Sequence, residues 1–491
     1  MAETVKLLVG GEWVTSEATE TVPVYNPSDG TEIAATPLCG EAEVDSVVRA
    51  AADAFPDWAN TPPVDRARVL FRLVALMEEH FEELAQLVTR ENGKTIDDSR
   101  GEIRRGIEVA EFACGAPALL MGDSLENIAR EIDCDTIRQP MGVSVGITPF
   151  NFPSMVPMWT IPIALACGNT YVLKPSERVP LSAIRLGELL TEAGLPPGVF
   201  NIVHGGKDAV NALLAHPEVK TISFVGSTPI AQYVYETATR NGKRVQSAGG
   251  AKNYLIVLPD ADLDSTIAAV MGSAYGCAGE RCMAGSVLVC AEGAGERFME
   301  PLSETARSFR VGPTDRDSEA QMGPVVTRAH LVKIHGHIES GLSEGAELIV
   351  DGRDVQVEAT PDGFYLGATI FDQVKPEMAI AREEIFGPVL STMHTNDLDG
   401  AIARCNASGF GNAAVLFTSS GGAARKFKHE VNAGMVGINV GVPAPMAFFP
   451  FSGWNNSFFG DLHVQGAEGV SFFTRQKVTI SRWLETKRQF F

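Results

Sequence analysis

The chain has 491 residues, 45% of them hydrophobic and 21% charged, with a formal net charge of −21. This length exceeds what one hydrophobic core usually covers, so we expect a globular protein of two or more lobes. The acidic excess argues against a nucleic-acid partner, which would need a basic face.

Cysteine usage and apolar runs exclude several further classes. The eight cysteines are scattered and form no Cys-x-x-Cys or His-x-x-His cluster, so we expect neither a disulfide framework nor a metal site. The N-terminus lacks the long apolar run of a signal peptide. The longest apolar stretch, residues 155–167, is short and contains two prolines, so we expect no membrane partner and a cytoplasmic location.

The first third of the chain predicts short strands, then helices, then a hairpin. Residues 5–14 and 21–25 are typical of strands, and apolar positions three and four apart from residue 41 onward predict a helix. We predict a second helix over 65–91, ending at Asn92-Gly93, and a third from about residue 96 that carries Arg105. Between 122 and 140 the chain is polar with spaced isoleucines, which favours a projecting hairpin.

Strands then alternate with helices. Short apolar runs occupy 143–147, 170–173, 200–203, 221–225 and 254–257, and helical patterns occupy 183–193, 208–215 and 229–240. This alternation predicts an α/β fold in which a parallel sheet carries helices on both faces. Ligands bind beyond the carboxyl ends of such strands, so the residues that follow each strand are the candidates for function.

Several of these residues suit a dinucleotide. Gly226-Ser227 opens a helix, where backbone amides and the helix dipole favour a pyrophosphate. Lys174 and Glu177 follow another strand and suit a ribose, with the carboxylate repelling a 2′-phosphate. No strand is followed by Gly-x-Gly-x-x-Gly. Each feature also has a plain structural explanation, a helix cap for Gly226-Ser227 and surface positions for the other two.

The candidate nucleophile is Cys282, within Gly272-Ser-Ala-Tyr-Gly-Cys-Ala-Gly-Glu-Arg-Cys-Met-Ala284. A thiol attacks only as the thiolate, which needs an electropositive, partly solvated setting, and we expect the neighbouring Arg281 to provide it. The alternative is a buried segment of small residues, because free cysteine is among the most buried residue types.

Five segments together resemble the aldehyde dehydrogenase superfamily over nearly the whole chain. They are Pro149-Phe-Asn-Phe-Pro153, Lys174-Pro-Ser-Glu177, Phe224-Val-Gly-Ser227, Gly279-Glu-Arg-Cys282 and Glu384-Ile-Phe-Gly-Pro388. The resemblance implies a Rossmann-like parallel-sheet NAD-binding domain over 1–121 and 140–248 and an α/β catalytic domain over 249–450. It also implies an oligomerisation arm and C-terminal tail over 122–139 and 451–491, and a homo-oligomer, specifically a tetramer.

The resemblance also implies roles for individual residues. Cys282 is then the catalytic nucleophile, and the Asn151 side chain forms the oxyanion hole with the Cys282 backbone amide. The residues that would bind NAD are Thr148, Phe150, Lys174, Glu177, Arg178, Ser227, Gly249, Glu384 and Phe386.

One departure from the superfamily bears on how the acyl-enzyme is released. Hydrolytic members carry a water-activating glutamate where this chain has Ala248, in Ala248-Gly-Gly-Ala-Lys252. Alanine accepts no proton, whereas a thiol with a pKa of about 8.5 ionises with far less help than water. This difference favours coenzyme A as the acceptor.

Three further segments resemble the CoA-acylating methylmalonate-semialdehyde dehydrogenases within that superfamily: Gly279-Glu-Arg-Cys-Met-Ala284, Gly101-Glu-Ile-Arg-Arg-Gly106 and Ser457-Phe-Phe-Gly-Asp461. This implies a methylmalonate or malonate semialdehyde substrate whose carboxylate binds Arg105 and Arg281 and is lost as carbon dioxide, giving propionyl-CoA or acetyl-CoA. The alternatives are a hydrolytic, non-acylating semialdehyde dehydrogenase and, from another class, an inactive binding relative.

Overall fold

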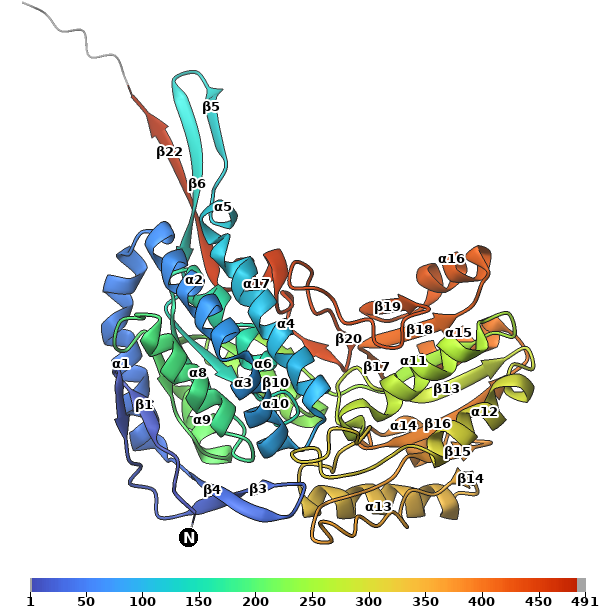
Figure 1. Ribbon diagram of the computed structural model, residues 1–491. Helices are drawn as coiled ribbons and strands as arrows, with labels where there is room; N and C mark the ends of the chain where they lie inside the picture. The colour runs from blue at the N-terminus through green and yellow to red at the C-terminus, as the bar shows by residue number, and fades with distance from the viewer. Residues whose placement is uncertain (1, 484–491) are drawn as a thin grey trace, which may run out of the picture.

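The computed structural model describes residues 2–483, which fold into two α/β lobes and a projecting arm (Figure 1). Each lobe is built around one large sheet, and the arm is a separate sheet of three strands. None of the helices within residues 2–483 combines the length and apolar character that a membrane crossing requires.

The sheet of the first lobe has the order β2-β1-β9-β8-β7-β10-β11-β21. Its centre is parallel, and the two edges are antiparallel. The strands are β1 (Leu7–Val9), β2 (Glu12–Val14), β7 (Val143–Ile147), β8 (Thr170–Lys174), β9 (Phe200–Ile202), β10 (Val219–Val225), β11 (Arg244–Ala248) and β21 (Phe458–Phe459).

Helices cover both faces of this sheet, as the strand–helix alternation predicts. Along β8, Tyr171 and Leu173 pack into one apolar core and Val172 into another, because successive side chains of a strand point to opposite faces. One core includes helices α2 (Pro63–Glu79), α3 (Phe81–Asn92), α4 (Ile96–Cys114) and α8 (Leu181–Glu192). The other includes α1 (Glu41–Asn60), α9 (Lys207–Ala215) and α10 (Thr228–Arg240).

The second lobe has the sheet order β14-β15-β16-β13-β12-β18-β19, with β14 antiparallel to its neighbour. Its strands are β12 (Asn253–Val257), β13 (Gly285–Ala291), β14 (Glu347–Val350), β15 (Thr369–Asp372), β16 (Val389–Thr395), β18 (Ala413–Phe417) and β19 (Met435–Ile438). Its main helices are α11 (Leu263–Tyr275), α12 (Gly295–Arg307), α13 (Arg328–Ser343), α15 (Leu398–Asn406) and α16 (Gly421–Glu430).

Two of the sequence-based predictions about elements are wrong. The strand predicted at 254–257 is β12, which pairs with β13 and β18 in the second lobe rather than continuing the first sheet. An apolar run carries no information about its partners, so the sheet to which it belongs cannot be inferred from its own residues. The helix predicted over 65–91 is two helices, α2 and α3, separated at His80.

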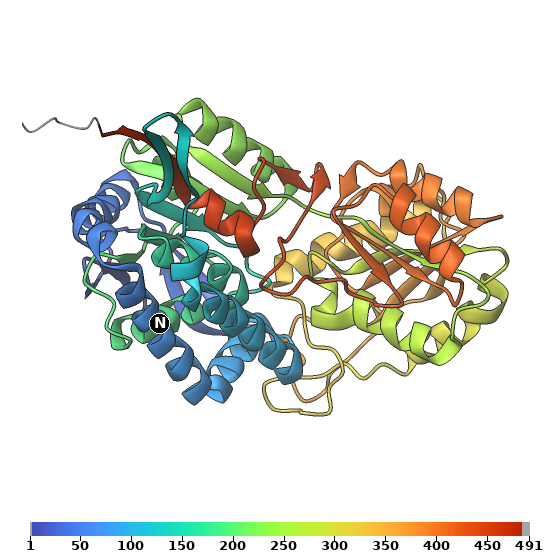
Figure 2. The same ribbon diagram turned by 90° about the horizontal axis from the view of Figure 1, so that it is seen from above.

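The arm consists of β5 (Ser124–Ala129), β6 (Ile132–Pro140) and β22 (Thr474–Arg482), all antiparallel (Figure 1). The hairpin predicted over 122–140 is thus present, with β22 as an added third strand. The segment that precedes β22 passes between the lobes (Figure 2), where β20 (Trp454–Asn455) pairs with β17 (Phe410–Gly411) and β21 pairs with β11. Residues 484–491 of the expected tail lie outside the described residues.

Candidate active site

Two cavities meet at Cys282. The first, of about 60 Å³, is lined largely by apolar side chains together with Arg105 and Glu108. The second, of about 320 Å³, is lined by residues of both lobes, including Asn151 and Glu384. Within the part of the chain that the structure describes, Cys282 is the residue that lines both cavities, so its sulfur can react with a molecule on either side.

The loop that carries Cys282 is held from the second lobe. It follows α11 and a short 3-10 turn (Gly276–Gly279), and the Cys282 carbonyl accepts hydrogen bonds from Asn253 Nδ2 (2.9 Å) and Asn412 Nδ2 (3.0 Å). Cys277 and Ala278 have φ angles of +52° and +53°, in the left-handed region that non-glycine residues rarely adopt. Such strain persists only where surrounding contacts fix the backbone, here just before the candidate nucleophile.

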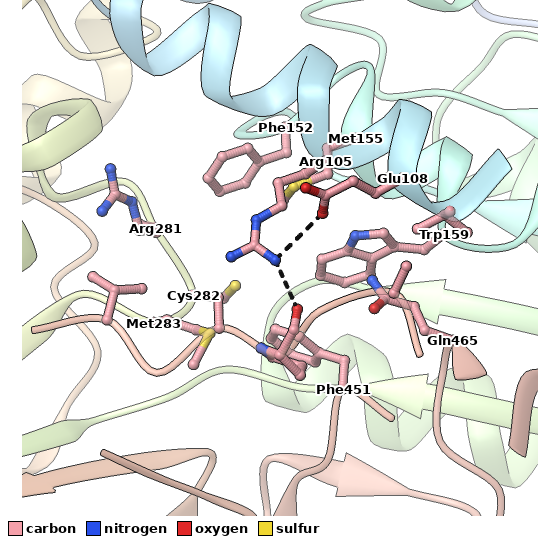
Figure 3. Close-up of a pocket in the computed structure, with 15 residues that line it drawn as sticks. Arg105, Glu108, Phe152, Met155, Trp159, Arg281, Cys282, Met283, Phe451 and Gln465 are labelled. Atoms are coloured by element: carbon pink, nitrogen blue, oxygen red, sulfur yellow. Dashed lines mark hydrogen bonds and ion pairs between the residues drawn. The ribbon is translucent and has the colours of Figure 1, made fainter. Parts of the chain in front are cut away.

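The thiol of Cys282 is neutral at physiological pH in this structure. Burial, with a smaller contribution from the Glu384 carboxylate, raises the pKa of Cys282 to about 12, although Arg281 opposes both effects. Arg281 thus favours the thiolate as expected, but burial and the Glu384 carboxylate outweigh it. Arg281 Nη2 donates to Asp98 Oδ1 (3.1 Å), and its guanidinium points away from the sulfur (Figure 3).

This pKa predicts the pH dependence of alkylation. Because the folded pKa lies above the usual value of a thiol, the thiolate is scarce at pH 7, and iodoacetamide labelling of Cys282 should rise about tenfold per pH unit up to at least pH 9. Mass spectrometry of the Cys282 peptide measures the rate. Glu384→Gln should accelerate labelling and Arg281→Met should slow it. Fast labelling at pH 7 that does not change with pH would contradict the neutral thiol.

Besides Glu108, helix α4 presents three charged side chains toward the site. Asp98, Glu102 and Arg105 are four and three residues apart, a spacing that places them along one face of a helix. Arg105 Nη1 donates to the Pro445 carbonyl (3.0 Å) and lies 3.6 Å from Glu108 Oε2. Its guanidinium reaches into the first cavity toward the Cys282 sulfur (Figure 3). The structure thus brings Arg105 and Cys282 together, whereas the guanidinium of Arg281 is turned toward Asp98.

A fully buried ion pair supports the Asn151 segment. Lys94 Nζ lies 2.6 Å from Glu102 Oε2, and both side chains are inaccessible to solvent. Lys94 Nζ also donates to the Asn151 carbonyl (2.6 Å), while Glu102 Oε1 accepts from the Ser154 amide (2.8 Å). Burial alone would lower the pKa of Lys94, but Glu102, Cys277 and Asp98 together outweigh it, so the pKa lies above its usual value. This network fixes the backbone on both sides of Phe152.

The second cavity collects most residues assigned to the cofactor. Its lining includes Phe150, Asn151, Arg178, Ser227, Gly249, Glu384 and Phe386. Ser227 lines this cavity and is the N-cap of α10, but its side chain makes no capping hydrogen bond. The Ser227 hydroxyl therefore does not occupy the backbone amides of the first helical turn. Glu384 Oε1 accepts from the Ala251 amide (2.8 Å), and the rings of Phe150 and Phe386 meet edge to face at 5.7 Å.

The remaining assigned residues lie outside that lining. The Thr148 amide donates to the Lys174 carbonyl (3.1 Å), which joins the ends of β7 and β8. Lys174 Nζ donates to the Gly205 carbonyl (2.8 Å) and lies 3.5 Å from Glu177 Oε2. Lys174 is buried and Glu177 half-buried, so both are part of the first lobe rather than freely solvated.

Two residues at the site, His330 and Glu280, are not among those to which the sequence motifs assign a role. His330 lines the second cavity and its Nε2–H donates to the Phe386 carbonyl (2.7 Å), while burial lowers the pKa of His330 to about 4. Glu280 is buried nearby, and burial raises its pKa to about 8. His330 carries no local signal, because it reaches the site through the packing of α13 against the Cys282 loop. Glu280 lies two residues before Cys282, but its contacts with the Val326 amide and His330 depend on tertiary packing. Within residues 2–483 no group of three His, Cys, Asp or Glu side chains is placed to hold a metal ion.

Cys282 thus lies between two cavities, at the junction of a parallel-sheet lobe and a second α/β lobe, an arrangement that suits an enzyme with a nucleophilic thiol. The model of the aldehyde dehydrogenase family matches residues 13–479. The chain therefore belongs to the aldehyde dehydrogenase family, and the fold and enzyme class that the sequence motifs imply are confirmed.

The chain is also similar, over nearly its full length, to proteins whose names specify a substrate. The chain is 53% identical to a malonate-semialdehyde dehydrogenase of Halalkalibacterium halodurans, over 98% of this chain and 99% of the relative. It is 46% identical to the crystal structure of a methylmalonate-semialdehyde dehydrogenase of Oceanimonas doudoroffii, with a TM-score of 0.97 and 99% of each chain covered. A Sinorhizobium meliloti protein provisionally given the latter name, crystallised with NAD, is 45% identical, with a TM-score of 0.98 and 100% of each chain covered.

Proposed function

We propose that the chain is an NAD-dependent, CoA-acylating dehydrogenase of malonate or methylmalonate semialdehyde. The observation that carries the proposal is the position of Arg105, a cation that lines the same cavity as Cys282. An aldehyde carbon at the sulfur would place a carboxylate on the adjacent carbon within reach of this guanidinium, which suits a planar carboxylate. The names of the relatives support the same substrates.

The second cavity fits NAD by the chemistry of its lining. It offers the N-terminus of a 13-residue helix for a pyrophosphate, two aromatic rings for a flat group, and the Glu384 carboxylate near Cys282. NAD bound there would supply the hydride acceptor that aldehyde oxidation needs. Lys174 and Glu177 are proposed to bind the adenosine ribose, with Thr148, Arg178 and Gly249 completing the site.

The residues of the chain then account for the remaining chemistry. Because the pKa of Cys282 is raised, its thiol must first lose its proton to solvent, and the sulfur then attacks the aldehyde carbon. Asn151, with the Cys282 amide, stabilises the alkoxide, an interaction worth a few kcal/mol per donor. Oxidation leaves a thioester on Cys282, loss of carbon dioxide follows, and the thiol of coenzyme A takes the acyl group.

Coenzyme A is proposed because the side chain at position 248 cannot accept a proton from a water molecule. Ala248 is buried at the end of β11, where its carbonyl accepts from the Gly226 amide. Its methyl group cannot activate water, whereas an acceptor thiol needs less assistance. The hydrolytic alternative would require another base for water.

The organisation of the chain is part of the same proposal. We assign residues 1–121 and 140–248 to the NAD-binding domain, 249–450 to the catalytic domain, and 122–139 with the tail from 451 to oligomerisation. The apolar side chains exposed on β5, β6 and β22, which include Leu125, Ile137, Val478 and Ile480, suit contact with another subunit. A homotetramer in the cytoplasm is the proposed state.

The deciding experiment measures NADH formation from malonate semialdehyde with and without coenzyme A, and identifies the acyl product by mass spectrometry. The proposal expects turnover to depend on coenzyme A and to yield acetyl-CoA and carbon dioxide. Equal turnover without coenzyme A, with a free acid as product, would establish the hydrolytic alternative instead.

Arg105→Leu should discriminate between substrates. A lost charge-assisted contact to the substrate carboxylate is worth about 1.5–3 kcal/mol. The kcat/KM for malonate semialdehyde should therefore fall roughly ten- to a hundredfold more than that for propanal, which has no carboxylate. Steady-state kinetics with both aldehydes give this ratio.

Arg281→Leu is the matched comparison for Arg105→Leu. Arg281 is held by Asp98 at 3.1 Å, so its removal should change the ratio between the two aldehydes less than the removal of Arg105. Equal losses with propanal and the semialdehyde in the Arg105 variant would show that Arg105 does not bind the carboxylate.

A further inference from the structure

Glu108 is a second charged residue of α4 in the cavity of Cys282. It lies one turn after Arg105, and its side chain points between Arg105 and Trp159 (Figure 3). The side chain is 25% exposed, but its Oε2 atom is buried and has no hydrogen-bond partner within the described residues. The nearest cation, Arg105 Nη1, is 3.6 Å away, beyond hydrogen-bond distance. A buried carboxylate oxygen left without a donor is costly to the fold, so its presence in a reaction cavity calls for an explanation.

The proposed reaction needs a proton donor in this cavity. When the thioester loses carbon dioxide, the electron pair of the broken carbon–carbon bond moves into the thioester enolate, and the α-carbon must then gain a proton. The titratable residues that line the cavity are Arg105, Glu108, Arg281 and Cys282. Arginine does not release its proton in proteins, and the Cys282 sulfur is bonded to the acyl group at this stage. The carboxyl group of Glu108 is the one that remains.

Substrate binding would place the required proton on Glu108. In the free protein Arg105 is the cation nearest to Glu108, but a substrate carboxylate on Arg105 brings a second negative charge into the same partly apolar cavity. Two carboxylates that share one cation in such surroundings favour protonation of one of them. The substrate carboxylate keeps the guanidinium, so Glu108 takes the proton from solvent as the substrate enters.

We infer that Glu108 is the general acid that protonates the α-carbon after decarboxylation. The carbon–carbon bond to the leaving carbon dioxide breaks, the Glu108 O–H bond breaks, and a carbon–hydrogen bond forms at the α-carbon. Glu108 is left as a carboxylate, and the acyl group stays on Cys282 until coenzyme A accepts it. The step consumes no oxidant or reductant. This inference rests on the proposed function, because only a decarboxylating enzyme needs such a donor.

The test is Glu108→Gln, which keeps the size of the side chain but has no acidic proton. Rapid mixing of enzyme, NAD, coenzyme A and malonate semialdehyde should give a fast burst of about one NADH per active site, because the steps up to the thioester do not use Glu108. Steady-state turnover and carbon dioxide release should then be slower than in the wild type by about 10²–10³-fold, the usual contribution of general acid catalysis. Glu108→Asp, which retains an acid, should recover a large part of this loss.

Three outcomes would overturn the inference. If burst and steady-state rates fall by the same factor, Glu108 only positions Arg105 or supports the fold. If neither rate changes, another group or solvent supplies the proton. If wild-type enzyme forms NADH from malonate semialdehyde without releasing carbon dioxide, the proposed function itself fails, and the need for the acid disappears with it. Propanal oxidation, which involves no decarboxylation, should lose much less than semialdehyde turnover in Glu108→Gln.

Discussion

Cys282→Ala is expected to abolish NADH formation with every aldehyde, because the alanine side chain cannot form the thioester. Removing a covalent nucleophile typically costs roughly 10⁴-fold or more in kcat. Cofactor binding should be nearly unchanged, since Cys282 is one of many residues that line the second cavity. Steady-state kinetics measure the loss, and fluorescence titration with NAD measures the binding.

Cys134→Ala is the matched control for this variant. Cys134 is also partly exposed, but it lies on β6 in the arm, which is a separate sheet from those of the two lobes. Its removal should leave turnover close to that of the wild type. Substantial activity in Cys282→Ala that disappears when Cys277 is alkylated would assign the nucleophile to Cys277 instead.

Lys94→Met is expected to lower the free energy of unfolding by about 3–5 kcal/mol, because it leaves the Glu102 carboxylate buried without its cation. The Asn151 carbonyl also loses a donor at 2.6 Å, so the alkoxide-forming step should slow in the protein that remains folded. Urea denaturation measures the stability, provided that the slope with denaturant is unchanged.

A double variant separates the unpaired charge from the loss of packing. Lys94→Met combined with Glu102→Leu removes both charges, and apolar replacement of a buried pair is often nearly neutral. The double variant should be more stable than Lys94→Met, although it loses the hydrogen bonds from the amides of Ser154 and Met155. A double variant less stable than Lys94→Met would show that these backbone contacts outweigh the ion pair.

Local patterns predict the first lobe and the outline of the site. Apolar runs and turn residues locate β7 to β10 and the helices between them, and the residues that follow β7 and β10 include Asn151 and Ser227, both in the second cavity. This succeeds because a parallel sheet places the ends of its strands at one edge, so that sequence position translates directly into spatial proximity.

Other features depend on contacts that no local pattern contains. The membership of β12 in the second sheet depends on its partners β13 and β18, and the raised pKa of Cys282 depends on its burial and on the nearby Glu384 carboxylate. Lys94, in the loop between α3 and α4, and Glu108, on α4, resemble ordinary charged surface residues in the sequence. Their positions in the site become evident only when this region is packed against the segment that contains Asn151 and the loop that contains Pro445.

The strands β21 and β22 have a consequence for how the protein is made. The first lobe begins near residue 5, yet its sheet acquires its last edge strand only from residues 458–459, and the arm acquires its third strand from residues 474–482. β6 pairs with β5 along one edge, but its other edge pairs with β22, which lies more than 300 residues later in the chain. During synthesis on the ribosome, that second edge therefore stays unpaired until β22 has been made. The sheet of the second lobe lies between residues 253 and 438, so it can close first. Until β22 emerges, β6 has an unpaired edge, and unpaired edges promote association between incomplete chains.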